Sequence, residues 1–100
     1  MKHITKADIV EKIALGTGIT KLETEAIVEG FINSIIEALK LGKAIEIRGF
    51  GSYGIRKKRG RMARNPKSGD KVFIEEHFAP TFKFSKEFKA IVASGLKEKV

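Results

Sequence analysis

One stretch of the chain, residues 55–74, decides the fold, and it reads IRKKRGRMARNPKSGDKVFI. It holds eight basic side chains and one acidic side chain, so it carries +7 of the chain's formal net charge of +8. Residues 1–50, in contrast, hold seven basic and seven acidic side chains and sum to zero. Charge concentrated in one segment in this way favours an electrostatic contact with a polyanion.

A charge run by itself is more typical of a solvated, disordered linker, but the residues in and around this one indicate an ordered arm. Residues 65–70, NPKSGD, are typical of a turn, because proline presets φ and Gly69 can adopt a left-handed conformation. Tyr53 and Ile55 precede the basic run and residues 72–74 follow it, so two strands can pair back from that turn. We therefore predict a long two-stranded ribbon, the arm, over about residues 55–74, which stays mobile until it meets a partner.

The composition limits the other possibilities. One hundred residues without cysteine allow a single domain, 1–100, and exclude disulfides and thiolate metal sites. Without the arm, about eighty residues remain to build a core, a size at which oligomerisation is a common remedy. No apolar run has the length of about eighteen residues that a membrane span needs, and the N-terminus lacks the apolar core of a signal peptide. We expect a soluble, cytoplasmic protein with no membrane partner.

Two helices are predicted before the arm. Residues 5–8, Thr-Lys-Ala-Asp, resemble a capping box, and residues 16–18, Gly-Thr-Gly, end the short amphipathic helix that follows. A second box at residues 20–23, Thr-Lys-Leu-Glu, opens a helix from about Leu22 to Leu41, which Gly42 closes. The centre of this second helix is apolar, so we reject a helix-turn-helix protein, whose second helix would need polar side chains for the major groove.

The apolar face of the second helix is unusually broad. At about 100° per residue, its apolar side chains cover about half of the circumference, whereas a helix on a monomer core needs a stripe only somewhat wider than 100°. A face this broad requires two surfaces, and a second copy of the chain is the simplest source of the other one. The alternative is that the remaining helices cover it within a monomer. The expected dimer-interface residues are Ile27, Val28, Phe31, Ile32, Ile35, Ile36, Leu39 and Phe50.

The remaining segments predict a small sheet and a last helix. Lys43–Arg48 alternates as a strand, residues 49–51 turn the chain, and Ser52–Lys58 feeds the arm. Phe78–Phe84 is a third strand, placed at an edge by its proline. Ser85 caps a helix from Lys86 to about residue 96. The fold class is α+β: a helical dimerisation part (1–42), a three-stranded antiparallel sheet with the arm (43–84) and a C-terminal helix (85–100).

Catalysis finds no support in the sequence. His3 and His77 are distant from each other, no glycine-rich loop opens a helix, and the carboxylates are scattered. We therefore expect no enzymatic activity, no metal and no cofactor.

Phe31, Phe50, Phe82 and Phe88 occupy inward-facing positions and are expected in the core. Phe73 and Phe78 lie near the root of the arm, where core packing and stacking on unpaired bases are both open.

Two stretches together resemble a known family. Residues 45–53, IEIRGFGSY, and residues 64–72, RNPKSGDKV, resemble the two signature stretches of the bacterial HU and integration host factor family. The residues of these two stretches are more similar to integration host factor, especially its beta subunit, than to HU. The resemblance implies an intertwined dimer whose two arms wrap a DNA duplex along its minor groove and bend it. It also implies that a proline at each arm tip, Pro66 here, inserts between base pairs.

The resemblance extends to individual positions of the body. Thr5 and Lys6, Arg48, and Ser85 and Lys86 match residues that meet the duplex, and the positions of Glu46 and Arg48 contribute to sequence preference in integration host factor. Ser85 replaces the usual glycine, and residues 58–63 are this chain's own version of the arm, so sequence specificity stays open. The expected DNA-binding residues are Thr5, Lys6, Glu46, Arg48, Arg56, Lys57, Lys58, Arg59, Arg61, Arg64, Asn65, Pro66, Lys67, Lys71, Ser85 and Lys86.

The resulting hypothesis is a non-enzymatic architectural protein of the nucleoid, with double-stranded DNA as its partner. Such a protein organises the nucleoid and assists recombination, replication or transcription. We expect a homodimer, with a heterodimer with a related subunit as the alternative. Two other functions stay open: an RNA-binding protein with a basic β-arm, which would prefer structured RNA, and a structural protein whose arm docks on an acidic partner.

Overall fold

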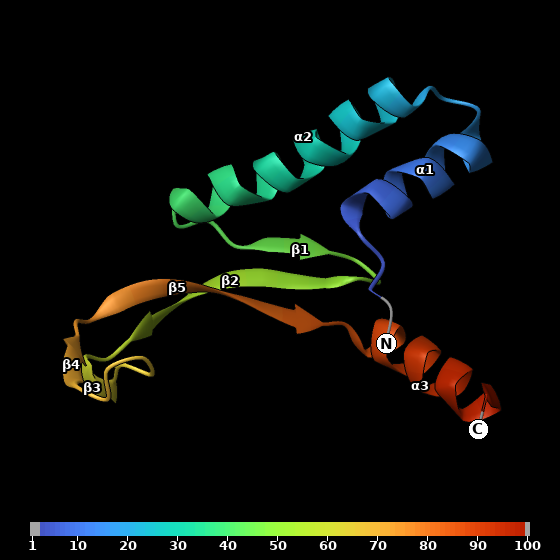
Figure 1. Ribbon diagram of the computed structural model, residues 1–100. Coiled ribbons are helices and arrows are strands. Elements are labelled where there is room, and N and C mark those ends of the chain that lie inside the picture. Colours follow the sequence, from blue (N-terminus) through green and yellow to red (C-terminus); the bar gives the residue numbers. More distant parts are fainter. Residues whose placement is uncertain (1–2, 100) are drawn as a thin grey trace. The chain divides into compact units, whose positions relative to one another are not determined.

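A computed structural model describes residues 3–99 of the chain, and its order of helices and strands confirms the predicted α+β fold (Figure 1). Contacts within the chain divide it into two units, the first ending at Glu37 and the second beginning at Ala38. The elements are α1 (Lys6–Thr17), α2 (Lys21–Lys40), β1 (Ile45–Ile47), β2 (Gly51–Lys58), β3 (Arg61–Arg64), β4 (Lys71–Ile74), β5 (His77–Phe84) and α3 (Lys86–Lys99).

Both predicted helix starts in the first unit are confirmed. The Thr5 hydroxyl accepts a hydrogen bond from the Asp8 N–H at 3.2 Å, and the Asp8 carboxylate accepts one from the Thr5 N–H at 2.9 Å. This reciprocal capping box satisfies two N–H groups that the helix itself cannot pair. α1 ends at Thr17 and is capped by Gly18, whose φ of 79° lies in the left-handed region. The Thr20 hydroxyl accepts from the Glu23 N–H at 3.1 Å and so caps α2.

Few side chains of the first unit are buried. Val10 and Ala14 of α1 are buried, as is Thr24 of α2, whose hydroxyl donates to the Thr20 carbonyl at 2.8 Å. Phe31, which the sequence places in the core, is 50% exposed. Within the described chain the apolar face of α2 therefore remains largely uncovered.

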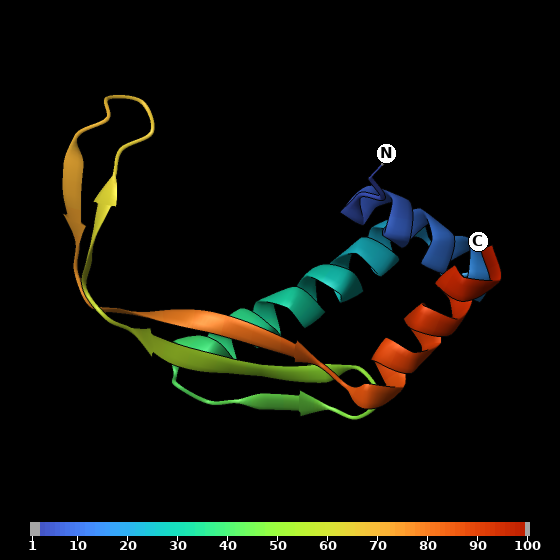
Figure 2. The ribbon, with the colours of Figure 1, turned by 90° about the horizontal axis from the view of Figure 1, so that it is seen from below.

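The second unit contains a three-stranded antiparallel sheet in the order β1-β2-β5. Ile45 and Ile47 are half-buried and Glu46 is exposed, so the predicted alternation is confirmed, although β1 is shorter than expected. β2 and β5 run side by side along their whole length, from Gly51 opposite Phe84 to Lys58 opposite His77 (Figure 2). β5 lies at an edge of the sheet, where a residue without an N–H such as its proline is tolerated.

An aromatic cluster forms the core of the second unit. The ring centroids of Tyr53 and Phe82 lie 4.6 Å apart, and Phe50 lies 5.4 Å from Phe82 and 5.5 Å from Phe88. Phe84 stacks on Phe88 at 4.7 Å. The predicted core positions of Phe50, Phe82 and Phe88 are thus confirmed, and the cluster joins the sheet to α3.

α3 begins where the sequence predicts. The Ser85 hydroxyl accepts a hydrogen bond from the Phe88 N–H at 3.1 Å, as expected of an N-cap. The helix continues to Lys99, beyond the predicted end near residue 96. Ile91 and Val92 of this helix are exposed in the described chain.

The arm consists of two ladders instead of one continuous ribbon. The β2-β5 ladder ends at Lys58 opposite His77, and the β3-β4 ladder resumes at Arg61 opposite Ile74. The register is unchanged, so the two intervening residues of each strand are unpaired and no residue is inserted. A Cβ on Gly60 would lie 2.8 Å from the Phe73 ring, which shows that the ring lies against the backbone at this interruption. Beyond it the arm turns away from the sheet (Figure 2).

Candidate nucleic-acid interface

The tip of the arm is a tightly bonded turn. The Asn65 N–H donates to the Asp70 carbonyl at 2.8 Å, and the Gly69 N–H donates to the Asn65 carbonyl at 2.7 Å. The Asn65 side-chain oxygen accepts from the Lys67 N–H at 2.9 Å, and Gly69 has a φ of 76°. The predicted turn is confirmed. Pro66 lies between Asn65 and Lys67, which this side-chain hydrogen bond joins, and Pro66 is exposed.

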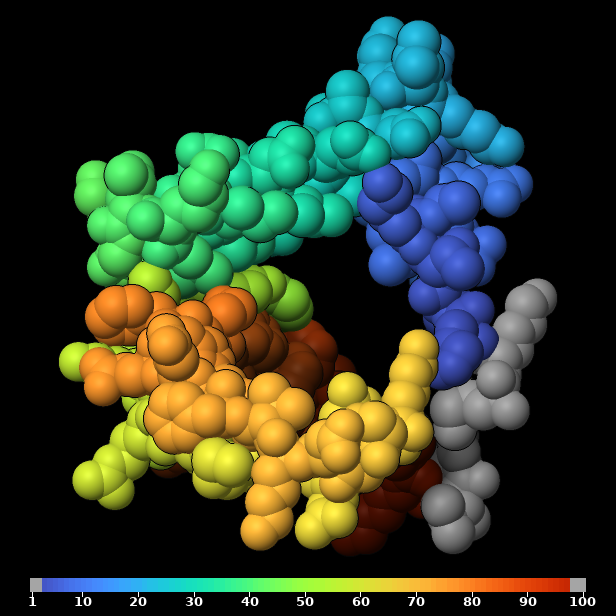
Figure 3. Space-filling view, turned by 60° about the vertical axis from the view of Figure 1, so that its left-hand side comes forward, coloured from blue at the N-terminus to red at the C-terminus, as the bar shows by residue number. Residues whose placement is uncertain are grey.

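The basic side chains of the arm are exposed, and the space-filling view shows the arm (yellow to light orange) with little covering it (Figure 3). Two of them have partners in or next to the arm. The Lys57 ammonium lies 2.5 Å from the Glu76 carboxylate, and the Arg64 guanidinium donates to the Gly69 carbonyl at 3.1 Å. The exposed basic residues are Arg56, Lys57, Lys58, Arg59, Arg61, Arg64, Lys67 and Lys71.

A second group of predicted residues meets at the other end of the sheet. Glu46, Arg48, Ser85 and Lys86 line one open groove of about 610 Å³. The sheet register explains why, since Glu46 lies opposite Ser52 and places its side chain on the outer face. The backbone N–H of Ser85 donates to the Phe50 carbonyl at 3.0 Å and thereby holds the start of α3 beside the turn before β2.

Sequence reasoning missed eight residues that line this groove, and four of them are polar or charged: Ser52, Lys83, Glu87 and Lys89. Ser52 pairs with Lys83 across β2 and β5, so both share the outer face with Glu46. Strand alternation could have identified Lys83, because its neighbours Phe82 and Phe84 point into the aromatic cluster. Lys89 can be assigned to the groove only when the position of α3 is known.

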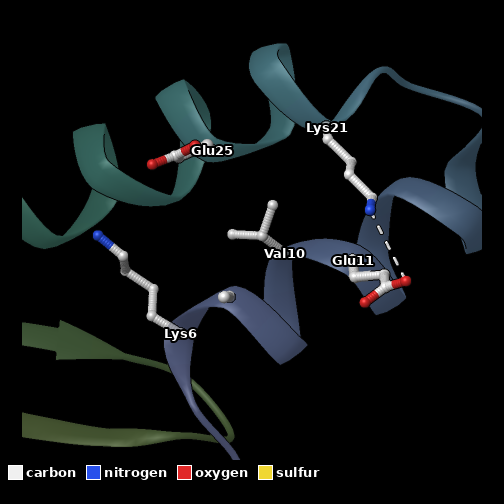
Figure 4. A pocket seen from close by; sticks show the side chains of 6 residues that line it. Lys6, Val10, Glu11, Lys21 and Glu25 are labelled. Atoms are coloured by element: carbon white, nitrogen blue, oxygen red, sulfur yellow. Dashed lines mark ion pairs between the residues drawn. The ribbon is translucent and has the colours of Figure 1, made fainter.

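Thr5 and Lys6 belong to the first unit, where Lys6 is already paired. Its ammonium lies 2.6 Å from the Glu29 carboxylate, and this hydrogen bond with its Coulomb attraction raises the pKa of Lys6 above its ordinary value. Figure 4 shows Lys6 and Val10 of α1 pointing towards α2 at a small hollow of about 220 Å³. Lys21 and Glu11 form a second ion pair there, at 3.7 Å.

No cluster of three or more potential metal ligands occurs among the residues that the structure describes. In the same part of the chain, no helix is both long and apolar enough to cross a membrane.

Comparison with known proteins decides the family. A family profile described as bacterial DNA-binding protein matches residues 4–93. The chain belongs to this family. Integration host factor subunit beta of Vibrio atlanticus is 39% identical over 94 residues, which cover 93% of this chain and 100% of that protein. Integration host factor subunit alpha of Methylococcus capsulatus is 36% identical over 89 residues, which cover 89% of this chain and 81% of that protein.

A solved member of the HU and integration host factor family has the same fold. In a cocrystal structure of Anabaena HU with DNA, the HU chain matches with a TM-score of 0.80 and 32% identity. The match covers 89% of this chain and 97% of that one. The resemblance predicted from residues 45–53 and 64–72 is therefore confirmed, and so is the α+β fold of the single chain.

Proposed function

We propose that this protein is an architectural DNA-binding protein that grips duplex DNA along the minor groove and bends it. The observation that carries the proposal is the arm, where +7 of charge surrounds a hydrogen-bonded turn that presents Pro66 to solvent. An exposed basic ribbon can neutralise phosphates and release their counterions. Membership of the family and the likeness to an HU chain crystallised with DNA support the same function.

Pro66 supplies the wedge in this mechanism. Its ring is apolar and rigid, and the bond from the Lys67 N–H to Asn65 fixes the backbone on both sides of it. A ring held in this way can enter a base step without first ordering the loop. Unstacking a step costs a few kcal/mol, which the additional phosphate contacts of a bent duplex offset.

The groove at the other end of the sheet receives the flanking duplex. Arg48, Lys83 and Lys86 are cations that suit phosphates, and the N-terminus of α3, which suits an anion, lies in the same groove. Glu46 can only accept hydrogen bonds, so it repels phosphate and is suited to the amino group of a base. Glu46 is therefore a residue through which this chain would express sequence preference, and the family resemblance implies the same role for Arg48 beside it.

A second chain completes the fold in this proposal. Ile27 and Ile36 of α2 are 61% and 48% exposed. An exposed apolar face of this kind marks a surface that a partner covers. We expect two copies to pair through the α2 face, with residues 1–42 as the dimerisation part, and a related subunit as the alternative partner. Sedimentation equilibrium of the purified chain should give a dimer at micromolar concentration. A well-folded monomer would rule out the homodimer, and a chain that folds only with a related subunit would favour the heterodimer.

In the cell, a protein of this kind acts on the nucleoid in the cytoplasm. By bending DNA it would compact the chromosome and bring distant sites together during recombination, replication or transcription. Its contribution is mechanical, with no chemical step.

The wedge is tested by comparing the two prolines of the chain. Pro66→Ala should reduce the bend of a bound duplex, measured by energy transfer between its ends, more than it reduces affinity. Pro80→Ala is the matched control, because Pro80 lies on the edge strand β5 and not at the arm tip. An unchanged bend for Pro66→Ala, or an equal loss for both variants, would remove the wedge from the mechanism.

A further inference from the structure

The register of the β3-β4 ladder sorts its side chains onto two faces. Directly opposed residues of an antiparallel pair point to the same side, and successive residues alternate. Arg64 opposite Lys71 and Met62 opposite Phe73 therefore share one face. The other face carries the pair of Ala63 and Val72, and the pair of Arg61 with Ile74.

Met62 and Phe73 form an apolar step that stays largely exposed in the described chain. They are 57% and 59% exposed, whereas Ala63 on the other face is half-buried. The Phe73 ring is also located, because it lies against Gly60, where an added Cβ would be 2.8 Å from its edge. Two large apolar side chains side by side on a ribbon without a core of its own indicate an interaction surface.

The neighbouring pair on the same face indicates what the partner carries. Arg64 and Lys71 lie directly opposite each other, and like charges in this position destabilise a ladder. Among the described residues neither forms an ion pair, and Arg64 donates to the Gly69 carbonyl instead. An anion bound between the two cations would remove the repulsion. The face thus presents an anion site next to an apolar step, two residues apart along each strand.

We propose that Met62 and Phe73 are a second apolar contact with duplex DNA, packing against deoxyribose faces in the minor groove beside a phosphate held by Arg64 and Lys71. The sugar-phosphate backbone offers the same two chemistries side by side, an apolar sugar face and an anionic phosphate. The inference rests on the proposed function and deepens it. Pro66 at the tip produces the bend, whereas the pair of Met62 and Phe73 adds affinity that does not depend on salt.

The double variant Met62→Thr with Phe73→Thr tests this contact. Threonine keeps the strand propensity of the ribbon and leaves every charge in place. Losing about 60 Å² of buried apolar surface corresponds to about tenfold weaker binding. We expect this loss at every salt concentration, with an unchanged slope of log affinity against log salt. Val72→Thr is the matched control, because Val72 is exposed on the opposite face of the same ribbon.

Three outcomes would overturn the inference: unchanged affinity of the double variant, an equal loss for Val72→Thr, and a reduced salt slope. If affinity is unchanged and self-association without DNA is lost, a second arm, and not DNA, covers the apolar step. If the unaltered protein did not bind duplex DNA at all, the proposed function itself would fail, so the two failures are distinguishable.

Discussion

Lys57 and Lys58 are neighbours on β2, but their surroundings differ. Lys57 lies opposite Phe78 and pairs with Glu76 at 2.5 Å, whereas Lys58 lies opposite His77 on the other face of the sheet. Among the described residues, Lys58 has no ion-pair partner. We predict that Lys58→Gln weakens DNA binding more than Lys57→Gln, because Lys57 must leave its carboxylate before it can bind a phosphate.

The size of the difference follows from the exposure of the pair. Each phosphate contact contributes about 0.9 to the slope of log affinity against log salt. The Lys57 and Glu76 side chains are 61% and 56% exposed, and an ion pair this open is worth about 0.2–1 kcal/mol. For each arm, the loss of DNA affinity should therefore be up to about fivefold smaller for Lys57→Gln than for Lys58→Gln. Glu76→Gln releases Lys57 and should strengthen binding by up to the same factor.

Fluorescence anisotropy of a labelled duplex, titrated at several salt concentrations, measures both quantities. The expected order of affinity, from tightest to weakest, is Glu76→Gln, the unaltered protein, Lys57→Gln and Lys58→Gln. The slope for Lys58→Gln should fall by about one per arm. Equal losses for the two lysine variants, or weaker binding by Glu76→Gln, would refute the reasoning that the ion pair competes with phosphate.

Three further predictions concern the scaffold and the tip. Gly51→Ala would bring a Cβ to 2.5 Å from the Lys83 carbonyl oxygen, so urea unfolding should show a loss of about 1–3 kcal/mol, and unchanged stability would mean that the sheet yields there. Thr5→Ala removes the hydroxyl that caps α1 and should lower the free energy of unfolding by about 1 kcal/mol, whereas Thr5→Ser should retain most of it. Asn65→Ala removes the acceptor of the Lys67 N–H and should reduce the bend at an unchanged salt slope; an unchanged bend would show that the turn does not need this bond.

The features that the sequence predicts correctly are those with local causes. The capping box at Thr5, the glycine ends of the helices and the turn around Pro66 each depend on residues within a few positions of one another. The alternation of Ile45 and Ile47 likewise determines which face of β1 is inward. Such signals do not require knowledge of which segments pair, so they can be read from the chain directly.

The features that the sequence does not predict depend on contacts between distant segments. The interruption of the arm involves Gly60 and the ring of Phe73, which are brought together only by the β3-β4 register. Lys83 and Lys89 enter the groove because β5 pairs with β2 and α3 packs on the aromatic cluster. The exposure of Phe31 has the same kind of origin, since contacts within the described chain leave half of its surface exposed.

The central claim is that this protein bends duplex DNA, and energy transfer across an end-labelled duplex of about 35 base pairs tests it most directly. The duplex would be titrated with the unaltered protein at two salt concentrations. We expect the two ends to come closer on binding, with an affinity that falls steeply as salt rises. Salt-sensitive binding at constant end separation would contradict bending, and tighter binding to structured RNA than to the duplex would point to the RNA-binding alternative.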